Sequence, residues 1–459
     1  MPDEYLKLSD YQRKGAIFLA SMQAAMLADE PGLGKTATAI HAADMLDEPH
    51  VFVVCPKSLI AQWRSEIQRF SLNPSEARWQ VTNYERVPHA VTQGLFTPNV
   101  MIVDESTFIK NPTAKRTQAV LNVGLQVIQR GGHVWFLTGT PIRNTECDLF
   151  YLMFLAYSGL RNEKVAHAPT IIMRSYMLFK EAYFLERTFN VGSSKSFTKI
   201  TGLRPEKRAE FLKLLQPVML HRTKKLLNLP PLSEESVYCD WADDMQRRSY
   251  ESAKQGVLAL EDGETKNITN LFAQLMRLRQ IALSPPLAGT SGGSAKTDAV
   301  KTLIQEVYDD RPFLVFTEFA SYAEALAKEL HCGCFTGTGH MSETQRQAAK
   351  AAFMAGKLRG LVLTAEAGGF GHNFQRASLV VFTDLPWTND VKEQCVDRAF
   401  RRGQENEVHV VTLLQRGTID EYMLRVLQRK RAVADRVLNA QQVFQLMRQD
   451  ALKGGELSA

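Results

Sequence analysis

The sequence lacks the features of a membrane protein and of an exported protein. Its 459 residues contain no apolar run that approaches the ~18 residues needed to cross a membrane. The first residues, Met-Pro-Asp-Glu-Tyr, are acidic and include no apolar stretch, so they do not read as a signal peptide. We therefore expect a protein of the cytoplasm.

Cysteine is scarce. Six cysteines are spread along the chain, and only Cys332 and Cys334 lie close together. Two sulfur ligands one residue apart, without a second pair or a nearby pair of histidines, do not make a zinc site. We therefore expect reduced, unpaired thiols.

Acidic residues are slightly fewer than basic ones. The chain has 55 Lys and Arg against 49 Asp and Glu, a net charge of +6. Such weak basicity is compatible with a polyanionic partner but does not require one. The composition, 45% hydrophobic and 23% charged, is that of an ordinary globular protein, long enough for about two to four domains.

Short apolar runs recur between stretches with helical character. They are Val51–Cys55, Val100–Val103, Val134–Leu137, Phe313–Phe316, Leu361–Leu363, Leu379–Phe382 and Val408–Leu414. Runs without alternating polar residues are typical of strands buried on both faces, as in parallel sheets covered by helices. Prolines at 230–231 and 285–286 and the Gly/Ser cluster at 290–294 separate the runs into two groups.

We therefore predict an α/β protein with two lobes. The expected boundaries are 1–230 for the first lobe and 231–440 for the second, followed by a tail at 441–459. Residues 158–210 and 240–285 are expected to be mainly helical additions.

Residues 28–36 read Ala-Asp-Glu-Pro-Gly-Leu-Gly-Lys-Thr. Gly32 and Gly34 let backbone N–H groups close around phosphate oxygens where a Cβ would block the approach. Lys35 can then reach the β- and γ-phosphates, and the Thr36 hydroxyl can ligate Mg²⁺. The segment predicts a loop that binds the phosphates of a nucleotide.

Residues 100–105 read Val-Met-Ile-Val-Asp-Glu and supply a second part of such a site. Asp104 ends an apolar run, so we expect it at the tip of a strand, where it can hold the same Mg²⁺. Glu105 beside it can orient and deprotonate the attacking water. A Gly-Lys-Thr triplet alone can occur by chance, but the acidic strand end at a suitable distance favours an ATP-hydrolysing site with ATP and Mg²⁺ as cofactors.

Residues 394–404 read Gln-Cys-Val-Asp-Arg-Ala-Phe-Arg-Arg-Gly-Gln. Arg398 and Arg401 are three residues apart, so on a helix they would share a face. Two guanidinium groups suit the charge that develops on a γ-phosphate in the transition state. A solvated basic helix is the alternative. In the lobe opposite the phosphate loop, the pair would complete the site only when the lobes close, which is how ATP binding can drive motion.

With these motifs in this order, the chain resembles a superfamily-two helicase-like ATPase of the Swi/Snf group, the double-stranded-DNA translocases. The resemblance covers about residues 6–430 and implies two RecA-like lobes with parallel sheets and helical insertions. Besides the segments above, it is carried by Leu8–Gly15, Val53–Trp63, Leu137–Asn144, Arg222–Lys224 with Leu229–Pro230, Leu278–Ile281 and Gly368–Asn373.

The resemblance implies roles for further residues. Gln12 would read the adenine, Gly371 would contact the nucleotide, and Arg398 and Arg401 would be arginine fingers. Contacts to DNA would come from Lys57, Ser58, Thr138, Thr140, Gly368, Gly369 and Asn373. Lys57 is indicated also by its place, because a Pro-Lys-Ser turn after a buried strand exposes a lysine and backbone N–H groups to a phosphate.

The chain departs from the expected patterns at a few positions. Asp29 stands where the strict phosphate loop has glycine, and Ser106 and Thr107 stand where the group has Ala or Gly and then His. His372 stands where the group usually has Leu. Because the motor motifs occupy almost all the residues, no chromatin-reading domain is expected, which favours a compact bacterial or viral enzyme over a nucleosome remodeller.

We therefore expect a monomeric, ATP-dependent translocase that moves along duplex DNA, including forked or branched duplexes, without separating strands. It would act in DNA remodelling, repair or removal of bound proteins. One alternative is a strand-separating or branch-migrating helicase, against which the lack of a recognisable wedge hairpin counts. Another is a non-catalytic scaffold or a factor that docks on RNA polymerase. The intact Lys35, Glu105, Arg398 and Arg401 count against a scaffold, although a protein partner stays possible.

Overall fold

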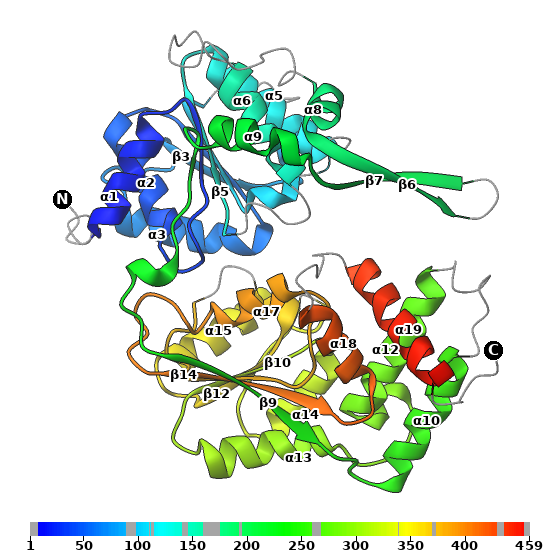
Figure 1. The fold of residues 1–459 in the computed structure, drawn as a ribbon. Helices are drawn as coiled ribbons and strands as arrows, with labels where there is room; N and C mark the ends of the chain where they lie inside the picture. The colour runs from blue at the N-terminus through cyan, green and yellow to red at the C-terminus, as the bar shows by residue number, and fades with distance from the viewer. Residues whose placement is uncertain are drawn as a thin grey trace. The chain divides into compact units, whose positions relative to one another are not determined.

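The computed structural model describes residues 8–88, 98–109, 111, 114–139, 146–158, 175–191, 195–258, 268–337, 339–369, 373–428 and 436–453. The chain forms two compact units, Met1–Leu227 and Asn228–Ala459 (Figure 1). Each unit has its own sheet and its own apolar core.

The first unit is built around a six-stranded sheet whose paired strands are all parallel. In spatial order the strands are β3 (Trp79–Asn83), β2 (Val51–Cys55), β4 (Val100–Asp104), β5 (His133–Leu137), β1 (Ala24–Leu27) and β8 (Met219–Leu220). The three apolar runs predicted as strands in this part of the chain are β2, β4 and β5, and they form the centre of the sheet. The shorter or more polar β1, β3 and β8 were not predicted.

Helices cover both faces of this sheet because successive side chains of each strand point to opposite sides. In β4, Ile102 packs on the face covered by α1 (Asp10–Ala20), α2 (Lys35–Leu46) and α3 (Ile60–Phe70). Met101 and Val103 pack on the other face, against α5 (Lys115–Gln129) and α6 (Phe150–Ser158). The sheet is therefore buried on both faces, as the unbroken apolar runs predicted.

A two-stranded antiparallel hairpin extends from the first unit (Figure 1). It consists of β6 (Phe184–Val191) and β7 (Lys195–Leu203), and its neighbours are α8 (Tyr176–Tyr183) and α9 (Arg208–Leu215). At its base, the ring of Phe184 lies 5.5 Å from that of Phe179. The expectation of mainly helical structure at 158–210 is wrong for these two strands. Both strands contain aromatic and β-branched residues, such as Phe189, Val191, Phe197 and Ile200, which favour strands over helices.

The second unit contains another six-stranded sheet, again with parallel pairs throughout. Its spatial order is β11 (Gly333–Phe335), β12 (Gly360–Thr364), β10 (Phe313–Thr317), β13 (Leu379–Phe382), β14 (Val408–Gln415) and β9 (Leu232–Cys239). The four predicted runs of this half are the four central strands. With both sheets in place, the predicted α/β class with two lobes and helical insertions is confirmed.

Helices again cover both faces of the sheet. Val315 and Val362 pack on the face of α13 (Ala295–Thr302) and α14 (Ala320–Glu329). Phe316 and Leu363 pack on the other face, where α15 (Glu343–Met354) and α17 (Asn389–Val396) lie. The short helix α16 (Ala365–Gly369) follows β12 directly.

Four helices form a further core beside this sheet. They are α10 (Asp244–Leu258), α12 (Ile268–Leu283), α18 (Ile419–Gln428) and α19 (Arg436–Lys453). The helical addition expected at 240–285 is therefore present. However, α19 crosses the predicted boundary at 440/441 and buries Val443, Phe444 and Met447 in this core. The expected tail is thus packed helix as far as Lys453, whereas the lobe boundary at 230/231 stays a prediction.

The described residues also bear on membrane spans, cysteine pairing and metal-binding groups. Within the described ranges, no helix has both the length and the apolar character needed to cross a membrane. All six cysteines are free, as expected. Among the described residues, no group of three or more His, Cys, Asp or Glu is arranged to hold a metal ion.

Candidate active site

Three neighbouring strands of the first unit end in one row. Leu27 of β1 pairs with Leu137 of β5, and Leu137 pairs in turn with Asp104 of β4. Because adjacent strands lie ~4.8 Å apart, this register places the ends of β1 and β4 about 10 Å from each other. The phosphate loop after β1 and Glu105 after β4 therefore emerge at the same edge of the sheet.

The phosphate loop connects β1 to α2, and two glycines determine its shape. Gly32 has φ +91° and Gly34 has φ +79°, left-handed conformations that side chains disfavour. Lys35 is the first residue of α2, and its ammonium donates a hydrogen bond to the backbone carbonyl of Asp29, 2.7 Å away. Thr36 follows in the first turn of α2, so the predicted ligands stand at the N-terminus of a helix, where phosphate binds well.

Gln12 of α1 lies buried beneath this loop. Its Nε2 donates to the backbone carbonyls of Leu33 and Gly34, both at 3.4 Å, and its Oε1 accepts from the N–H of Ser9 at 3.0 Å. A Cβ at Gly34 would collide with this amide. Gln12 thus supports the phosphate loop in this structure, and the adenine contact that the resemblance implies stays a prediction.

The fully buried carboxylate of Asp29 accounts for the departure from the strict phosphate-loop pattern. It accepts from Nε of Arg222 at 2.9 and 3.1 Å, and a second guanidinium nitrogen of Arg222 completes the ion pair. The guanidinium also donates to the carbonyl of Tyr11, whose hydroxyl donates to the carbonyl of Leu33 at 3.0 Å. A glycine at position 29 would leave Arg222 without this partner. The Arg222–Lys224 signature therefore contains an anchor of the phosphate loop, which the sequence reading missed.

Asp104 is the last residue of β4, as expected. Its Oδ2 accepts a hydrogen bond from the indole Nε1 of Trp63 at 2.8 Å, and its Oδ1 accepts from the N–H of Glu105 at 2.9 Å. Burial, together with the neighbouring Glu105, raises the pKa of Asp104 to about 6. Trp63, the last residue of the Val53–Trp63 segment, thus contacts the predicted metal ligand directly.

Glu105 has a left-handed backbone, with φ +51°. This conformation is uncommon for a residue with a side chain and is concentrated at functional positions. It is held in place by the Tyr84 hydroxyl, which donates to the carbonyl of Asp104 at 2.5 Å and lies 3.3 Å from the carbonyl of Glu105. Ser106 and Thr107, the two departures from the group pattern, are buried in the 3-10 turn that follows.

The residues at this edge fit a magnesium ion. Mg²⁺ is usually held by one or two protein oxygens together with phosphate oxygens and water, so a cage of several carboxylates is not required. Asp104 supplies a buried carboxylate, and Thr36 supplies a hydroxyl at the start of α2. A cation beside Asp104 would favour the ionised form that its burial disfavours.

Two of the residues predicted to contact DNA in the first unit are exposed. Lys57 and Ser58 lie in the 3-10 turn η2 (Lys57–Leu59), between β2 and α3. Val54 pairs with Val103, so this turn emerges at the same edge of the sheet as Asp104. Thr138, by contrast, is fully buried and donates its N–H to the carbonyl of Leu27. Thr140 lies outside the described residues, and all four DNA contacts stay predictions.

In the second unit, the expectation that Arg398 and Arg401 share the face of a helix is wrong. Helix α17 ends two residues before Arg398, and both arginines lie in the turns that follow. Phe374 donates its N–H to the carbonyl of Arg398 at 3.0 Å. The Nε2 of Gln404 donates to three backbone carbonyls at 2.7 to 3.1 Å. These bonds fold residues 397–404 into a loop, here called the arginine loop, whose role as arginine fingers stays a prediction.

The late glycine-rich segment begins in α16. Gly368 is buried, and a Cβ there would lie 2.8 and 2.9 Å from the side chains of Phe316 and Leu363, so a larger residue would have to displace these core groups. Gly369 ends α16, and the Oδ1 of Asn373 accepts a hydrogen bond from the backbone two residues later. Gly371 and His372 lie outside the described residues, so the predicted nucleotide contact of Gly371 stays a prediction.

Arg279 of the Leu278–Ile281 signature is buried at the ends of two strands. It donates to Oδ2 of Asp384 at 2.9 Å and to the carbonyl of Leu385 at 2.6 Å, and it lies over the ring of Trp387. The Thr317 hydroxyl donates to the other oxygen of Asp384 at 2.7 Å. This cluster ties α12 to the carboxyl ends of β10 and β13, so the signature has a structural role here.

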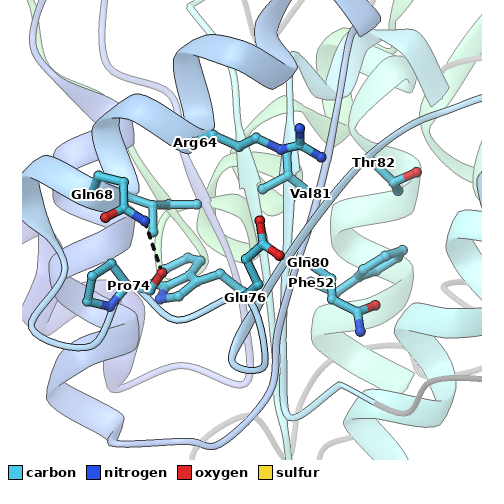
Figure 2. Close-up of a pocket in the computed structure, with 10 residues that line it drawn as sticks. Phe52, Arg64, Gln68, Pro74, Glu76, Gln80, Val81 and Thr82 are labelled. Carbon is cyan, nitrogen blue, oxygen red and sulfur yellow. Dashed lines mark hydrogen bonds between the residues drawn. The ribbon is translucent and has the colours of Figure 1, made fainter.

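A cavity of about 410 Å³ lies beside α3 and the edge strand β3 (Figure 2). Its lining combines the polar side chains of Arg64, Gln68, Glu76 and Gln80 with apolar groups. None of the predicted site residues lines it, so it is separate from the candidate ATP site.

Comparisons with known families find two domain families along the chain, the first of which extends past Leu227 into the second unit. Residues 11–87 and 80–287 match the SNF2-related domain, and residues 295–403 match the helicase conserved C-terminal domain. This chain belongs to the SNF2-related family. The Swi/Snf resemblance drawn from the motifs is thereby confirmed, and the two units are the two RecA-like lobes of a helicase-like ATPase.

Several proteins are similar over nearly the whole chain. An uncharacterized ATP-dependent helicase of Mycoplasma pneumoniae is 26% identical over 471 residues, which cover 94% of this chain and 42% of that protein. The mouse DNA annealing helicase and endonuclease ZRANB3 is 27% identical over 473 residues, 96% of this chain and 41% of that protein. The chain thus spans less than half the length of these SNF2-related relatives. A solved structure is also similar, the SWI2/SNF2 ATPase core of Sulfolobus solfataricus in complex with double-stranded DNA. Its sequence is 24% identical, the alignment covers 98% of this chain and 97% of the Sulfolobus chain, and the TM-score is 0.40.

Proposed function

We propose that this SNF2-related chain hydrolyses ATP in response to DNA and moves along duplex DNA without separating its strands. The observation that carries the proposal is the row of strand ends in the first unit. There the phosphate loop, with Lys35 and Thr36, and the acidic pair Asp104 and Glu105 emerge at one edge of a parallel sheet. Ligand sites of such sheets lie at the carboxyl ends of the strands.

In this proposal the first unit supplies most of the chemistry. Backbone N–H groups between Gly32 and Lys35 bind the phosphates, and the Lys35 ammonium exchanges the Asp29 carbonyl for a phosphate oxygen. Asp104 and Thr36 hold Mg²⁺, which when bound neutralises charge on the β- and γ-phosphates. Glu105 orients the attacking water and accepts its proton.

The arginine loop of the second unit supplies the remaining positive charge. Arg398 and Arg401 would stabilise the charge that develops on the transferred phosphoryl group, as arginine fingers do in other phosphoryl-transfer enzymes.

The proposed DNA contacts are mainly to phosphates. Exposed Lys57 and Ser58 present a cation and a hydroxyl at the ATP-site edge of the sheet, and the net charge of +6 favours a polyanion. Such contacts position the duplex but read no sequence. The name of the mouse relative, a DNA annealing helicase, supports DNA as the substrate. We propose a monomer in the cytoplasm that acts in remodelling, repair or removal of bound proteins.

Strand separation is the second candidate function, and one observation favours it. The sequence contains no recognisable wedge hairpin, which counts against unwinding. In the structure, however, β6 and β7 form a hairpin that extends from the first unit (Figure 1). A hairpin of this kind can separate strands when it meets a fork.

The proposal is tested by the ATPase rate without nucleic acid and with single-stranded DNA, duplex DNA, forked DNA and RNA, at equal phosphate concentration. Duplex and forked DNA should stimulate the rate, whereas single strands and RNA should do so weakly. Lys35→Ala serves as the control that removes turnover on every substrate. Equal stimulation by single strands and duplex, or stimulation by RNA alone, would contradict a duplex-tracking enzyme.

A further inference from the structure

Trp63 differs from the other buried tryptophans of the first unit in what its N–H contacts. The Trp79 indole donates to the Ser71 hydroxyl and to the carbonyl of Asn73, which are neutral groups. The Trp63 indole donates instead to the carboxylate of Asp104 at 2.8 Å, and its side chain is only 1% exposed. A hydrogen bond from a buried N–H to an ionised acceptor is about twice as strong as one between neutral groups.

This bond determines the orientation of the Asp104 carboxylate. An aspartate can rotate about its last side-chain torsion, but here each oxygen has its own donor, Glu105 N–H on Oδ1 and Trp63 Nε1 on Oδ2. These two donors thereby fix the orientation of the lone pairs of Asp104 that stay available to a metal ion. Partners of this kind behind a metal ligand typically change metal affinity or activity by 10–100-fold when they are lost.

The position of Trp63 in the chain connects this bond to the surface. Helix α3 begins at Ile60, directly after the turn η2 that exposes Lys57 and Ser58, and Trp63 lies one turn into the helix. The other end of this connection is β4, which pairs with β2 and carries Asp104. Only the first residues of α3 therefore separate η2 from the indole N–H.

We propose that Trp63 is a positioning residue, whose indole N–H orients Asp104 for Mg²⁺ and couples the exposed turn η2 to the ATP site. The inference rests on the proposed function, because it takes Asp104 as a metal ligand and η2 as a contact to DNA phosphates. It gives DNA a route to stimulate hydrolysis without touching the nucleotide.

The test removes the N–H in two variants, of which the second also keeps the size of the side chain. Trp63 is replaced by phenylalanine and, in a second variant, by benzothienylalanine, an isostere in which sulfur replaces the N–H. Trp79→Phe is the matched control, since it removes a buried indole donor of the same unit that does not contact Asp104. The Kd of Mn²⁺ is measured by electron paramagnetic resonance with ADP present, and the Kd of ADP is measured without metal.

Both Trp63 variants should bind Mn²⁺ with a Kd about 10–100-fold higher, while ADP affinity without metal and duplex affinity stay within about twofold of the parent. Stimulation of the ATPase by duplex should fall as well, and Trp79→Phe should match the parent in every measurement. Parental Mn²⁺ affinity in the benzothienylalanine variant would overturn the inference. So would an equal loss in Trp79→Phe, because the effect would then report loosened packing. A parent protein that neither hydrolyses ATP nor responds to DNA would instead overturn the proposed function itself.

Discussion

Arg222→Ala should release the phosphate loop from the Asp29–Arg222 ion pair and weaken nucleotide binding. In the structure the Asp29 side chain is 0% exposed and that of Arg222 is 12% exposed, so the substitution strands a carboxylate in a site from which water is largely excluded. The same guanidinium donates to the carbonyl of Tyr11, which links α1 to the loop. The substitution therefore removes two contacts, one to Asp29 and one to Tyr11 of α1.

The expected magnitude follows from the burial of the pair. Breaking a buried ion pair by removing one partner costs about 3–5 kcal/mol, since the remaining charge has neither solvent nor a partner. A cost of this size corresponds to a change on the order of 10²–10³-fold in a local opening equilibrium. The Kd of ATP should rise by about tenfold or more, because binding must first restore the loop.

Hydrogen exchange followed by mass spectrometry measures this opening directly. The reporters are the N–H groups of Met26, Ala28 and Glu30, which donate to Val218, Leu220 and Arg222 at 2.8 to 2.9 Å. Their protection should fall on the order of 10²-fold or more in Arg222→Ala.

Arg78→Ala provides a matched control. Arg78 pairs with Asp44 at 2.6 Å, with side-chain exposures of 5% and 1%, but neither residue contacts the phosphate loop in the described hydrogen bonds. This variant should lose protection around its own pair and keep the affinity for ATP. If Arg222→Ala retains parental protection at the three reporters and parental ATP affinity, Asp29 and Arg222 do not hold the loop.

Three further predictions concern the chemistry. Lys35→Ala should weaken both ATP binding and turnover, whereas Glu105→Gln should keep ATP binding and stop hydrolysis; parental turnover in Glu105→Gln would show that Glu105 is not the base. Arg398→Ala and Arg401→Ala should bind ATP almost normally and lose on the order of 10³-fold in kcat, and normal rates in both would show that they are not arginine fingers. Gln404→Ala removes the donor that ties the carbonyl of Ala399 in the arginine loop to those of Gln375 and Ala377, so the loop should lose its fixed position. The kcat should then fall with little change in the Kd of ATP, which steady-state turnover and stopped-flow binding measure separately.

The central strands could be predicted from the sequence because they are buried on both faces. Val100–Val103 and Leu379–Phe382, for example, are unbroken apolar runs and lie in the middle of their sheets. The edge strand β9 could not be found in this way, because Leu232–Cys239 is polar and mostly exposed. The hairpin β6–β7 was missed for a different reason, since charged and polar residues interrupt both strands and neither contains an unbroken apolar run.

The sequence predicts where the candidate ATP site lies but not which residues support it. Lys35 and Asp104 were predictable because phosphate and metal chemistry restricts both residue type and spacing. Their supports come from distant segments, and no local pattern indicates that Trp63 reaches Asp104 or that Arg222 reaches Asp29, 193 residues away in sequence. The arginine loop shows a further limit, because a spacing of three suggests a helix but the side chain of Gln404 folds the segment into a loop.

The most direct test of duplex translocation is displacement of a third strand from a triplex, compared with release of a strand from a partial duplex. In the presence of ATP and Mg²⁺, the parent protein should displace the third strand and leave the partial duplex paired, whereas Glu105→Gln should release no strand from either substrate. Binding to the duplex should weaken with salt, with a slope of about −0.9 per neutralised phosphate. Efficient release of the strand from the partial duplex, without displacement from the triplex, would contradict translocation and identify the chain as a strand-separating helicase.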